Sequence, residues 1–310
     1  MRRSPGRVLR AVFALPVLAA VIAPGRAATL AVGPGMPYPT PSAAAAAAHD
    51  GDVVRIAAGR YSDCAVWRAD RLQIIGAGMA ATVIADRACQ GKGLFVIRGR
   101  DVTVRDLALT GAHVPDGNGA GIRAEGGSLT VQRVRFADDE NGILTASNPA
   151  AVLIVADSEF LRDGSCAQAC AHGIYAGRIG GLRVTGSRFR ATREGHHIKS
   201  RALATEITGC DIEDGPDGTA SYLIDIPNGG AVRIADNRLE KGPLSENAAT
   251  AIMLGAEGVR NPTPAILITG NRFRDDGSPT VFVRNLTATP ARLDGNVLEG
   301  AVTPLATRLP

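Results

Sequence analysis

A short pattern of apolar residues recurs nine times along the chain, at intervals of 23 to 34 residues. Each unit has an aliphatic residue, then a small, polar or aliphatic residue three positions later, then a large apolar residue two positions after that. Gly, Asn and Asp turns separate strand-like segments of three to five residues. The nine units are Ile74/Ala77/Met79, Val104/Leu107/Leu109, Val131/Val134/Phe136, Val155/Ser158/Phe160, Val184/Ser187/Phe189, Ile207/Cys210/Ile212, Ile234/Asn237/Leu239, Ile268/Asn271/Phe273 and Leu293/Asn296/Leu298.

A unit of about 27 residues cannot bury its apolar face alone, so neighbouring units must stack into one continuous core. Leucine-rich repeats need more leucine, propellers need a longer unit, and a doubly wound fold needs helices that this chain lacks. The repeat therefore predicts an all-β chain, a right-handed parallel β-helix of about nine to ten coils over residues 51–300. The middle positions from Ser158 to Asn296 predict an internal polar stack, and Cys210 in that series is expected to be a buried packing residue.

The N-terminal part of the repeat carries its own motifs. Residues 41–49 contain six consecutive alanines and predict a short capping helix at about residues 40–50. A Gly-Asp-x-Val motif begins at Gly51, a Gly-x-Tyr motif ends at Tyr61, and Ile74 begins Ile-x-Gly-x-Gly. This order resembles the first coils of the pectin-lyase-like β-helix superfamily. The resemblance implies the fold over residues ~30–300 and leaves function open, because the superfamily holds lyases, hydrolases, epimerases, phage tailspikes and adhesive stalks.

The first 27 residues resemble an export signal. They hold five arginines and no acid, followed by an apolar run from Ala11 to Ala23 and by small residues at Gly25 and Ala27. We expect cleavage to leave residues 28–310 as a single β-helix domain, secreted or periplasmic, with no membrane span. Without residues 1–27, 29 basic side chains face 30 acidic ones, so the net charge falls from +4 to −1. Nucleic acid is therefore not an expected partner.

The five cysteines fit an oxidising compartment. Cys166 and Cys170 are close enough in sequence for a local disulfide. Cys64 and Cys89 lie about one coil apart, so a disulfide between them would link the first turns.

Reactive side chains concentrate on three consecutive coils. Side chains alternate along a strand, so one outward column is expected to contain Arg123, Leu144, Tyr175, Lys199, Asp225 and Met253. Three of the five histidines and one of the three lysines lie in the same region. An ordinary cross-strand ion pair would account for Lys199 and Asp225 alone, but not for the whole cluster. The candidate catalytic residues are Lys199, Tyr175, His197 and Asp225, and the candidate substrate-binding residues are Arg201, His172, His196, Glu194 and Asn228.

The cluster suits an acidic polysaccharide. A β-helix presents a long groove, and Arg and Lys side chains pair with uronate carboxylates. In β-elimination a cation neutralises the uronate, a base removes the C5 proton and an acid protonates the departing O4. We expect Lys199 to be the base, its pKa lowered by Arg201 and raised by Asp225, with Tyr175 or a histidine as the acid.

The segment from Glu194 to Arg201 resembles the Glu-x-x-x-x-Lys-Ser stretch of the chondroitinase-B-like and alginate lyase family. That resemblance implies that Lys199 is the base, that an arginine one coil further assists, and that nearby acidic residues hold calcium. The next coil, Ser221 to Asn228, offers no arginine, and the chain has no clear calcium-ligand motif.

Other function classes stay open at this point. A glycoside hydrolase would need paired carboxylates, for which Asp225 with Glu194 or Asp214 is the available choice. A polysaccharide-binding or cell-surface structural protein would need only the groove. A metal site of His172, His196 and His197 would require the turns to bring the rings together. We expect a monomer.

Overall fold

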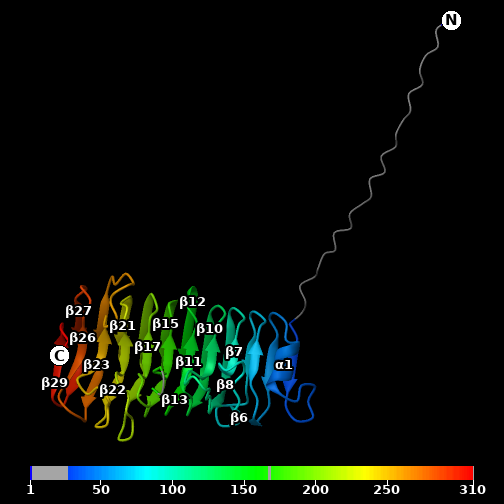
Figure 1. The fold of residues 1–310 in the computed structure, drawn as a ribbon, viewed down its shortest axis with the longest axis horizontal. Helices are drawn as coiled ribbons and strands as arrows, with labels where there is room; N and C mark the ends of the chain where they lie inside the picture. Colours follow the sequence, from blue (N-terminus) through cyan, green and yellow to red (C-terminus); the bar gives the residue numbers. More distant parts are fainter. Residues whose placement is uncertain (2–26, 167–168, 310) are drawn as a thin grey trace.

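The computed structural model describes Met1, residues 27–166 and residues 169–309. The predicted export signal at residues 1–27 lies outside this range apart from its two end residues. The described chain forms a solenoid in which corresponding strands of successive coils lie side by side along the long axis (Figure 1). Every pairing between named strands is parallel, and ten strands stack in one of the two sheets, which confirms the predicted parallel β-helix and its number of coils.

The smaller sheet carries the predicted outward column. Its strands are β4 (Ala65–Trp67), β7 (Gly93–Ile97), β9 (Ala120–Ala124), β11 (Asn141–Thr145), β14 (Ile174–Ala176), β17 (Ile198–Ser200), β20 (Ile224–Ile226), β23 (Thr250–Leu254), β26 (Thr280–Asn285) and β29 (Val302–Ala306).

The larger sheet has nineteen strands in two rows, which β8 and β10 join because each spans both. The first row is β1 (Thr29–Val32), β2 (Val53–Ile56), β5 (Gln73–Ile75), β8 (Val102–Thr110), β10 (Leu129–Ala137), β12 (Asn148–Ala156), β15 (Ile179–Thr185), β18 (Ala204–Thr208), β21 (Ala231–Ala235), β24 (Ile266–Thr269) and β27 (Ala291–Asp294). The second row adds β3 (Gly59–Tyr61), β6 (Thr82–Ala85), β13 (Glu159–Leu161), β16 (Arg188–Arg190), β19 (Asp211–Glu213), β22 (Arg238–Lys241), β25 (Arg272–Asp275) and β28 (Val297–Glu299).

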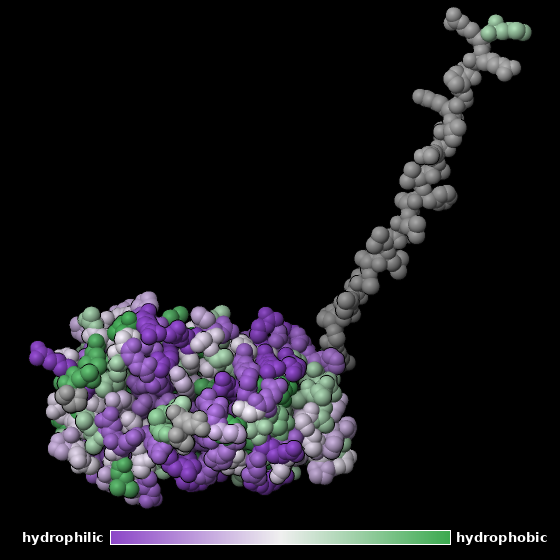
Figure 2. Space-filling view, viewed as in Figure 1, coloured by the Kyte–Doolittle hydropathy of each residue, from purple (hydrophilic) through white to green (hydrophobic). Residues whose placement is uncertain are grey.

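Apolar side chains of the repeat fill the interior in stacked columns. Phe136, Phe160 and Phe189 occupy paired positions, with ring centroids 4.7 and 4.4 Å apart. The outer surface in the view of Figure 2 is mostly hydrophilic, with scattered apolar residues. The core is therefore built from apolar side chains at equivalent positions of successive rungs, as the repeat predicted.

The predicted polar stack lies at the corner between the two rows of the larger sheet. The side-chain oxygen of one rung accepts the backbone N–H of the preceding rung, as from Ser158 to Ser187 (3.1 Å) and from Asn237 to Asn271 (3.1 Å). Cys210 is buried and unpaired, and its backbone N–H donates to Asn237 Oδ1. The stack thus satisfies turn N–H groups that no strand partner reaches.

Helix α1 (Pro41–Ala47) forms where the alanine run predicted one and ends before the predicted limit at about residue 50. Thr40 caps it by accepting the N–H of Ala43, and proline occupies the first helical position. The solenoid itself begins before the helix, because β1 pairs with β2, and it continues to β29. The predicted start at residue 51 is therefore one strand late.

Two disulfides join the cysteines that the sequence paired. Cys64–Cys89 links neighbouring early coils, and Cys166–Cys170 closes a local turn. Among the described residues, no helix is long and apolar enough to cross a membrane.

Candidate functional site

The outward column of the smaller sheet has the register that the sequence predicted. Tyr175 pairs with Leu144 on one side and Lys199 on the other, and Asp225 lies between Lys199 and Met253. Arg123 precedes Leu144 in the same column. Rungs about 4.8 Å apart place these side chains within reach of one another.

Lys199 lies between two carboxylates. Its Nζ is 3.1 Å from Asp225 Oδ2 and donates to Glu257 Oε1 at 2.9 Å. Burial by itself lowers the pKa of Lys199, but Asp225 and Glu257 outweigh it and raise the pKa above its usual value. The expectation of a pKa lowered by Arg201 is wrong, because the two carboxylates hold the ammonium protonated.

Arg201 follows the end of β17 and is fixed by three oxygen partners. Its Nε donates to Tyr175 Oη (2.9 Å), and its Nη1 contacts Asn228 Oδ1 (2.6 Å) and Glu257 Oε2 (2.6 Å). Its guanidinium carbon is also 5.7 Å from the centroid of the Tyr175 ring. Asn228 is buried, so it positions Arg201 from beneath rather than bordering the surface.

Glu257 is the main residue that sequence analysis missed. It lies in the turn after β23, and its side chain reaches back to Lys199 and Arg201, two coils earlier. Arg201 and Lys199 lower the pKa of Glu257 to about 2, although burial by itself acts in the opposite direction. The only signal in the sequence is one acid in the Gly255–Gly258 turn beside the column.

A stack of three rings borders the column on its N-terminal side. His172 lies against His196 with centroids 4.8 Å apart, and His196 lies against Tyr222 at 5.0 Å. His172 Nδ1 accepts the backbone N–H of His196, and His196 Nδ1 accepts that of Tyr222. Each ring occurs two residues before an inward isoleucine, so the repeat contained the signal for Tyr222.

The histidine protonation states follow from this stack. An imidazole whose Nδ1 accepts a hydrogen bond carries its proton on Nε2 when neutral. Burial, followed by the neighbouring positive charge of Lys199, lowers the pKa of His196 to about 3. Burial also lowers the pKa of His172 well below its usual value. Both rings are therefore neutral near pH 7.

Asp225 forms the floor of the cluster and is 2% exposed. Its Oδ2 is 3.1 Å from Lys199 Nζ and 3.4 Å from His196 Nε2, whereas Oδ1 has no hydrogen-bond partner in the described structure. Burial raises the pKa of Asp225 to about 6, against the opposing effect of Lys199. The carboxylate is therefore ionised at neutral pH and is a stronger base than an ordinary aspartate.

The expectation that His197 faces the column is wrong. Its side chain is completely buried, with Nδ1 2.8 Å from Thr192 Oγ1 and Nε2 2.8 Å from Asp214 Oδ1. The reason is that β17 begins at Ile198, so the alternation of a strand does not extend back to His197. His197 therefore stabilises the turn before β17 from inside the core, through its contacts with Thr192 and Asp214.

Glu194 lies in an exposed turn, where its Oε2 accepts the backbone N–H of Cys166. Asp214 is buried with His197. Neither carboxylate contacts Asp225, whose ionic contacts are with Lys199 and His196. The carboxylate pairs considered for a hydrolase are therefore not formed.

A metal ligand set does not form in the described part of the chain. No group of three or more His, Cys, Asp or Glu side chains has a suitable arrangement there. His197 points inward, away from the stacked rings of His172 and His196. The carboxylates of Asp225 and Glu257 are engaged with cations. The residues do not fit the calcium that the family resemblance implied, and no step below uses a metal.

A groove of about 520 Å³ opens beside the cluster. Arg123, Arg178, Arg201 and Arg260 outnumber its one acid, Glu257. Arg178 and Arg260 have no ion pair among the described residues, and Arg123 Nε is buried without a hydrogen-bond partner there. Sequence analysis placed Arg123 in the outward column, but it named none of these three arginines as a candidate site residue. The groove is lined by Asn118, Arg123, Leu144, Thr145, Ser147, Tyr175, Gly177, Arg178, Arg201, Glu257 and Arg260.

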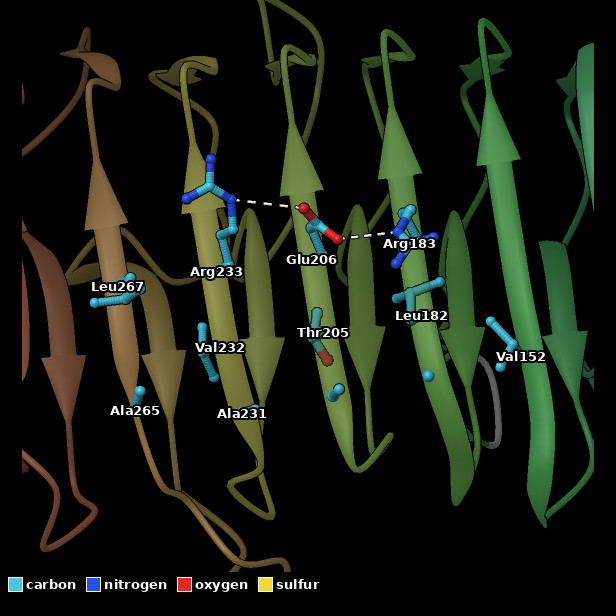
Figure 3. A pocket seen from close by; sticks show the side chains of 12 residues that line it. Val152, Leu182, Arg183, Thr205, Glu206, Ala231, Val232, Arg233, Ala265 and Leu267 are labelled. Carbon is cyan, nitrogen blue, oxygen red and sulfur yellow. Dashed lines mark hydrogen bonds and ion pairs between the residues drawn. The ribbon is translucent and has the colours of Figure 1, made fainter.

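A second depression of about 370 Å³ lies on the larger sheet and is mainly apolar (Figure 3). Its charged groups form one ladder, in which Glu206 contacts Arg183 at 2.9 Å and Arg233 at 3.5 Å. The other lining side chains are small or aliphatic apart from Thr205. This depression therefore lacks the reactive groups found on the smaller sheet.

No family model matches the chain, and no curated protein does. Among solved structures, an alginate lyase from Paenibacillus sp. str. FPU-7 aligns with a TM-score of 0.58 and 16% identity, over 89% of this chain and 99% of that one. The pectin methylesterase PemA from Erwinia chrysanthemi aligns at 0.46 and 13% identity, over 89% and 93%. The A-module of a mannuronan C-5 epimerase from Azotobacter vinelandii aligns at 0.39 and 17% identity, over 87% and 92%. The likeness to the alginate lyase shows that this chain has the right-handed parallel β-helix fold.

Proposed function

We propose that this protein is an exported enzyme that cleaves an acidic polysaccharide by β-elimination. The observation that carries the proposal is the column of Tyr175, Lys199 and Asp225 on three successive rungs, beside a groove with four arginines. A groove whose positive charge exceeds its negative charge favours a polymer with an anionic group on successive sugars. The similar Paenibacillus protein is named an alginate lyase, and we place the substrate of this chain in the same broad class.

Lys199 and Arg201 would bind the uronate carboxylate. When the C5 proton leaves, negative charge moves onto that carboxylate, and two fixed cations stabilise it. Because the raised pKa of Lys199 keeps it protonated, it serves as a cation here rather than as the base. Arg201 offers a planar donor group that is already oriented by Asn228.

Asp225 would accept the proton. Its Oδ1 is buried without a hydrogen-bond partner among the described residues, so substrate binding would have to uncover it. Its pKa of about 6 lets the carboxylate remain ionised at neutral pH while binding a proton well. The C5–H electron pair forms the C4–C5 double bond, and the C4–O4 bond breaks. The products are a new chain end and an unsaturated uronate.

Tyr175 would protonate the departing O4. Its oxygen accepts a hydrogen bond from Arg201 Nε, so its own O–H remains available to donate toward the groove. His196 would keep Asp225 in place through Nε2–H, without exchanging a proton itself. In this proposal Lys199 and Arg201 bind the carboxylate, Asp225 is the base, Tyr175 is the acid and His196 positions the base.

A panel of polysaccharides tests the activity. Alginate, pectate, glycosaminoglycans and bacterial exopolysaccharides are incubated with the protein, and unsaturated ends are followed by ultraviolet absorbance. We expect product from at least one uronate polymer and a loss of about a hundredfold or more for Lys199→Met. Glu206→Gln on the larger sheet is the control. Polymer binding without product would instead indicate a non-catalytic binding protein.

The cellular setting is part of the same proposal. An acidic polymer is met outside the cytoplasm, and the basic, then apolar, N-terminal segment and the two disulfides fit that setting. We propose that residues 28–310 act as one secreted or periplasmic domain and as a monomer.

A further inference from the structure

Glu257 presents its carboxylate to two cations at once. Oε1 accepts from Lys199 Nζ at 2.9 Å, and Oε2 lies 2.6 Å from Arg201 Nη1. One oxygen on each cation is the arrangement in which a pair of positive groups recognises a planar carboxylate.

The two carboxylates that contact Lys199 differ in their surroundings. Asp225 lies on the floor of the cluster with 3% of its side chain exposed, whereas the Glu257 side chain is 42% exposed. The side chain of Glu257 makes no other polar contact among the described residues, and its turn is held by backbone bonds such as Glu257 N to Pro227 O (3.1 Å). The carboxylate of Glu257 can therefore leave without unfolding the turn.

We propose that Lys199 and Arg201 form a carboxylate-binding subsite that Glu257 fills in the free protein, and that a uronate carboxylate of the substrate displaces Glu257 on binding. The inference rests on the proposed function and adds the residue that occupies this subsite in the free protein. Glu257 would then compete with the substrate for the two cations. A ligand carboxylate would occupy the subsite only if it binds Lys199 and Arg201 more favourably than the Glu257 carboxylate does.

The exchange keeps the charges balanced. In the free protein two cations, Lys199 and Arg201, face two carboxylates, and a uronate replaces one negative charge with another. Arg260 belongs to the same turn, lines the same groove and has no ion pair among the described residues. It is available to receive Glu257 after displacement.

Binding of short saturated trimers, titrated under conditions in which no unsaturated product is detected, tests the exchange by affinity rather than by rate. Trimers of galacturonate, mannuronate and glucuronate are titrated into wild-type protein and into Glu257→Gln by calorimetry, with neutral galactotriose as a reference. We expect Glu257→Gln to bind an acidic trimer roughly three- to tenfold more tightly, because a competing ion pair is removed. Neutral galactotriose should show no such gain.

Glu299→Gln is the matched control. Glu299 is 41% exposed and lies 2.6 Å from Arg272, so its substitution changes net charge and removes a similar ion pair away from the groove. It should leave trimer affinity unchanged. An equal gain in Glu299→Gln would attribute the effect to net charge and overturn the proposal, as would unchanged or weaker binding by a folded Glu257→Gln protein.

The two proposals fail in different ways. If an acidic trimer binds the wild-type protein and Glu257→Gln does not bind it more tightly, the displacement is wrong and the proposed substrate class stands. If no acidic trimer binds either protein, both are wrong. Thermal unfolding of each variant verifies that the comparison is between folded proteins.

Discussion

His196 Nε2 lies 3.4 Å from Asp225 Oδ2, on the next rung of the solenoid. Because His196 Nδ1 accepts the backbone N–H of Tyr222, Nε2 carries the proton and points toward the carboxylate. Burial lowers the pKa of the histidine to about 3 and raises that of the aspartate to about 6. At neutral pH the pair is thus a neutral imidazole beside an ionised carboxylate, and its charge comes from Asp225 alone.

Acid should destabilise the fold through His196. The unfolded chain binds a proton on this histidine near pH 6.5, whereas the folded chain binds it only near pH 3, so stability decreases as pH falls through that window. Asparagine at this position can still accept the Tyr222 N–H but cannot titrate. Urea unfolding at pH 6.5 and at pH 5 gives the decrease in the free energy of unfolding for each protein. We expect this decrease to be about 2 kcal/mol smaller for His196→Asn than for wild type. His49→Asn, at an exposed turn, should follow wild type, and parallel curves for His196→Asn would contradict the prediction.

The acid limb of the pH–rate profile should report Asp225. A base with a pKa of about 6 loses activity as pH falls through that value, because protonation removes its lone pair. We expect kcat/KM on the best substrate to decline below about pH 6, and Asp225→Asn to lower it by about a hundredfold or more. Glu206→Gln should have the same kcat/KM as wild type and the same decline below about pH 6. Near wild-type turnover by a folded Asp225→Asn protein would remove Asp225 from the role of base.

The sequence allowed the column from Arg123 to Met253 to be predicted because each member lies within a strand. Inside a strand the two-residue alternation is fixed, and the stacking of isoleucines fixes the register between coils. Tyr175, Lys199 and Asp225 therefore came out on the same side. The polar stack was predictable for a different reason, because its members lie between two strands at the same place in successive units of the repeat.

Turn residues were not predictable in this way. His197 precedes its strand, and its side chain enters the core where Thr192 and Asp214 satisfy it. Glu257 contacts residues 58 and 56 positions earlier because its turn folds back over two coils. Neither outcome follows from periodicity, since turns vary in length from coil to coil.

Asn228 should act on substrate affinity through Arg201. Its Oδ1 accepts from Arg201 Nη1 at 2.6 Å, and its Nδ2 donates to Gly258 O at 3.1 Å. We expect Asn228→Ala to raise KM about tenfold with a smaller change in kcat, because the guanidinium loses its orientation before the chemical step. Asn228→Asp keeps the acceptor for Arg201 but adds a carboxylate that competes with the uronate, so its KM should be no lower than that of Asn228→Ala. A wild-type KM in Asn228→Ala would show that Arg201 is held by its other partners.

The disulfide between Cys64 and Cys89 should stabilise the N-terminal coils. It closes a segment of 25 residues, for which loop entropy gives about 3.5 kcal/mol. We expect the Cys64→Ala/Cys89→Ala protein to unfold more readily by that amount and to show faster amide exchange in the first coils. Its activity at low temperature should match wild type, because Tyr175 on β14 lies three rungs beyond β7, the strand that follows Cys89. Reduced activity without reduced stability would contradict this separation.

The asparagine ladder should be more sensitive to substitution than the serine rungs. Asn271 Oδ1 accepts from both the backbone and the side chain of Asn237, and Asn271 Nδ2 donates to Ile234 O. Leucine at position 271 leaves these buried groups without partners, each at about 1–3 kcal/mol. Ser158 Oγ makes one bond as acceptor and one as donor, so Ser158→Ala should cost less, about 1–2 kcal/mol. Urea unfolding should place Asn271→Leu at least 2 kcal/mol below Ser158→Ala. Equal decreases in the free energy of unfolding for the two variants would contradict the prediction. They would mean that structural relaxation around the polar stack, rather than unpaired amide and backbone groups, determines the loss of stability.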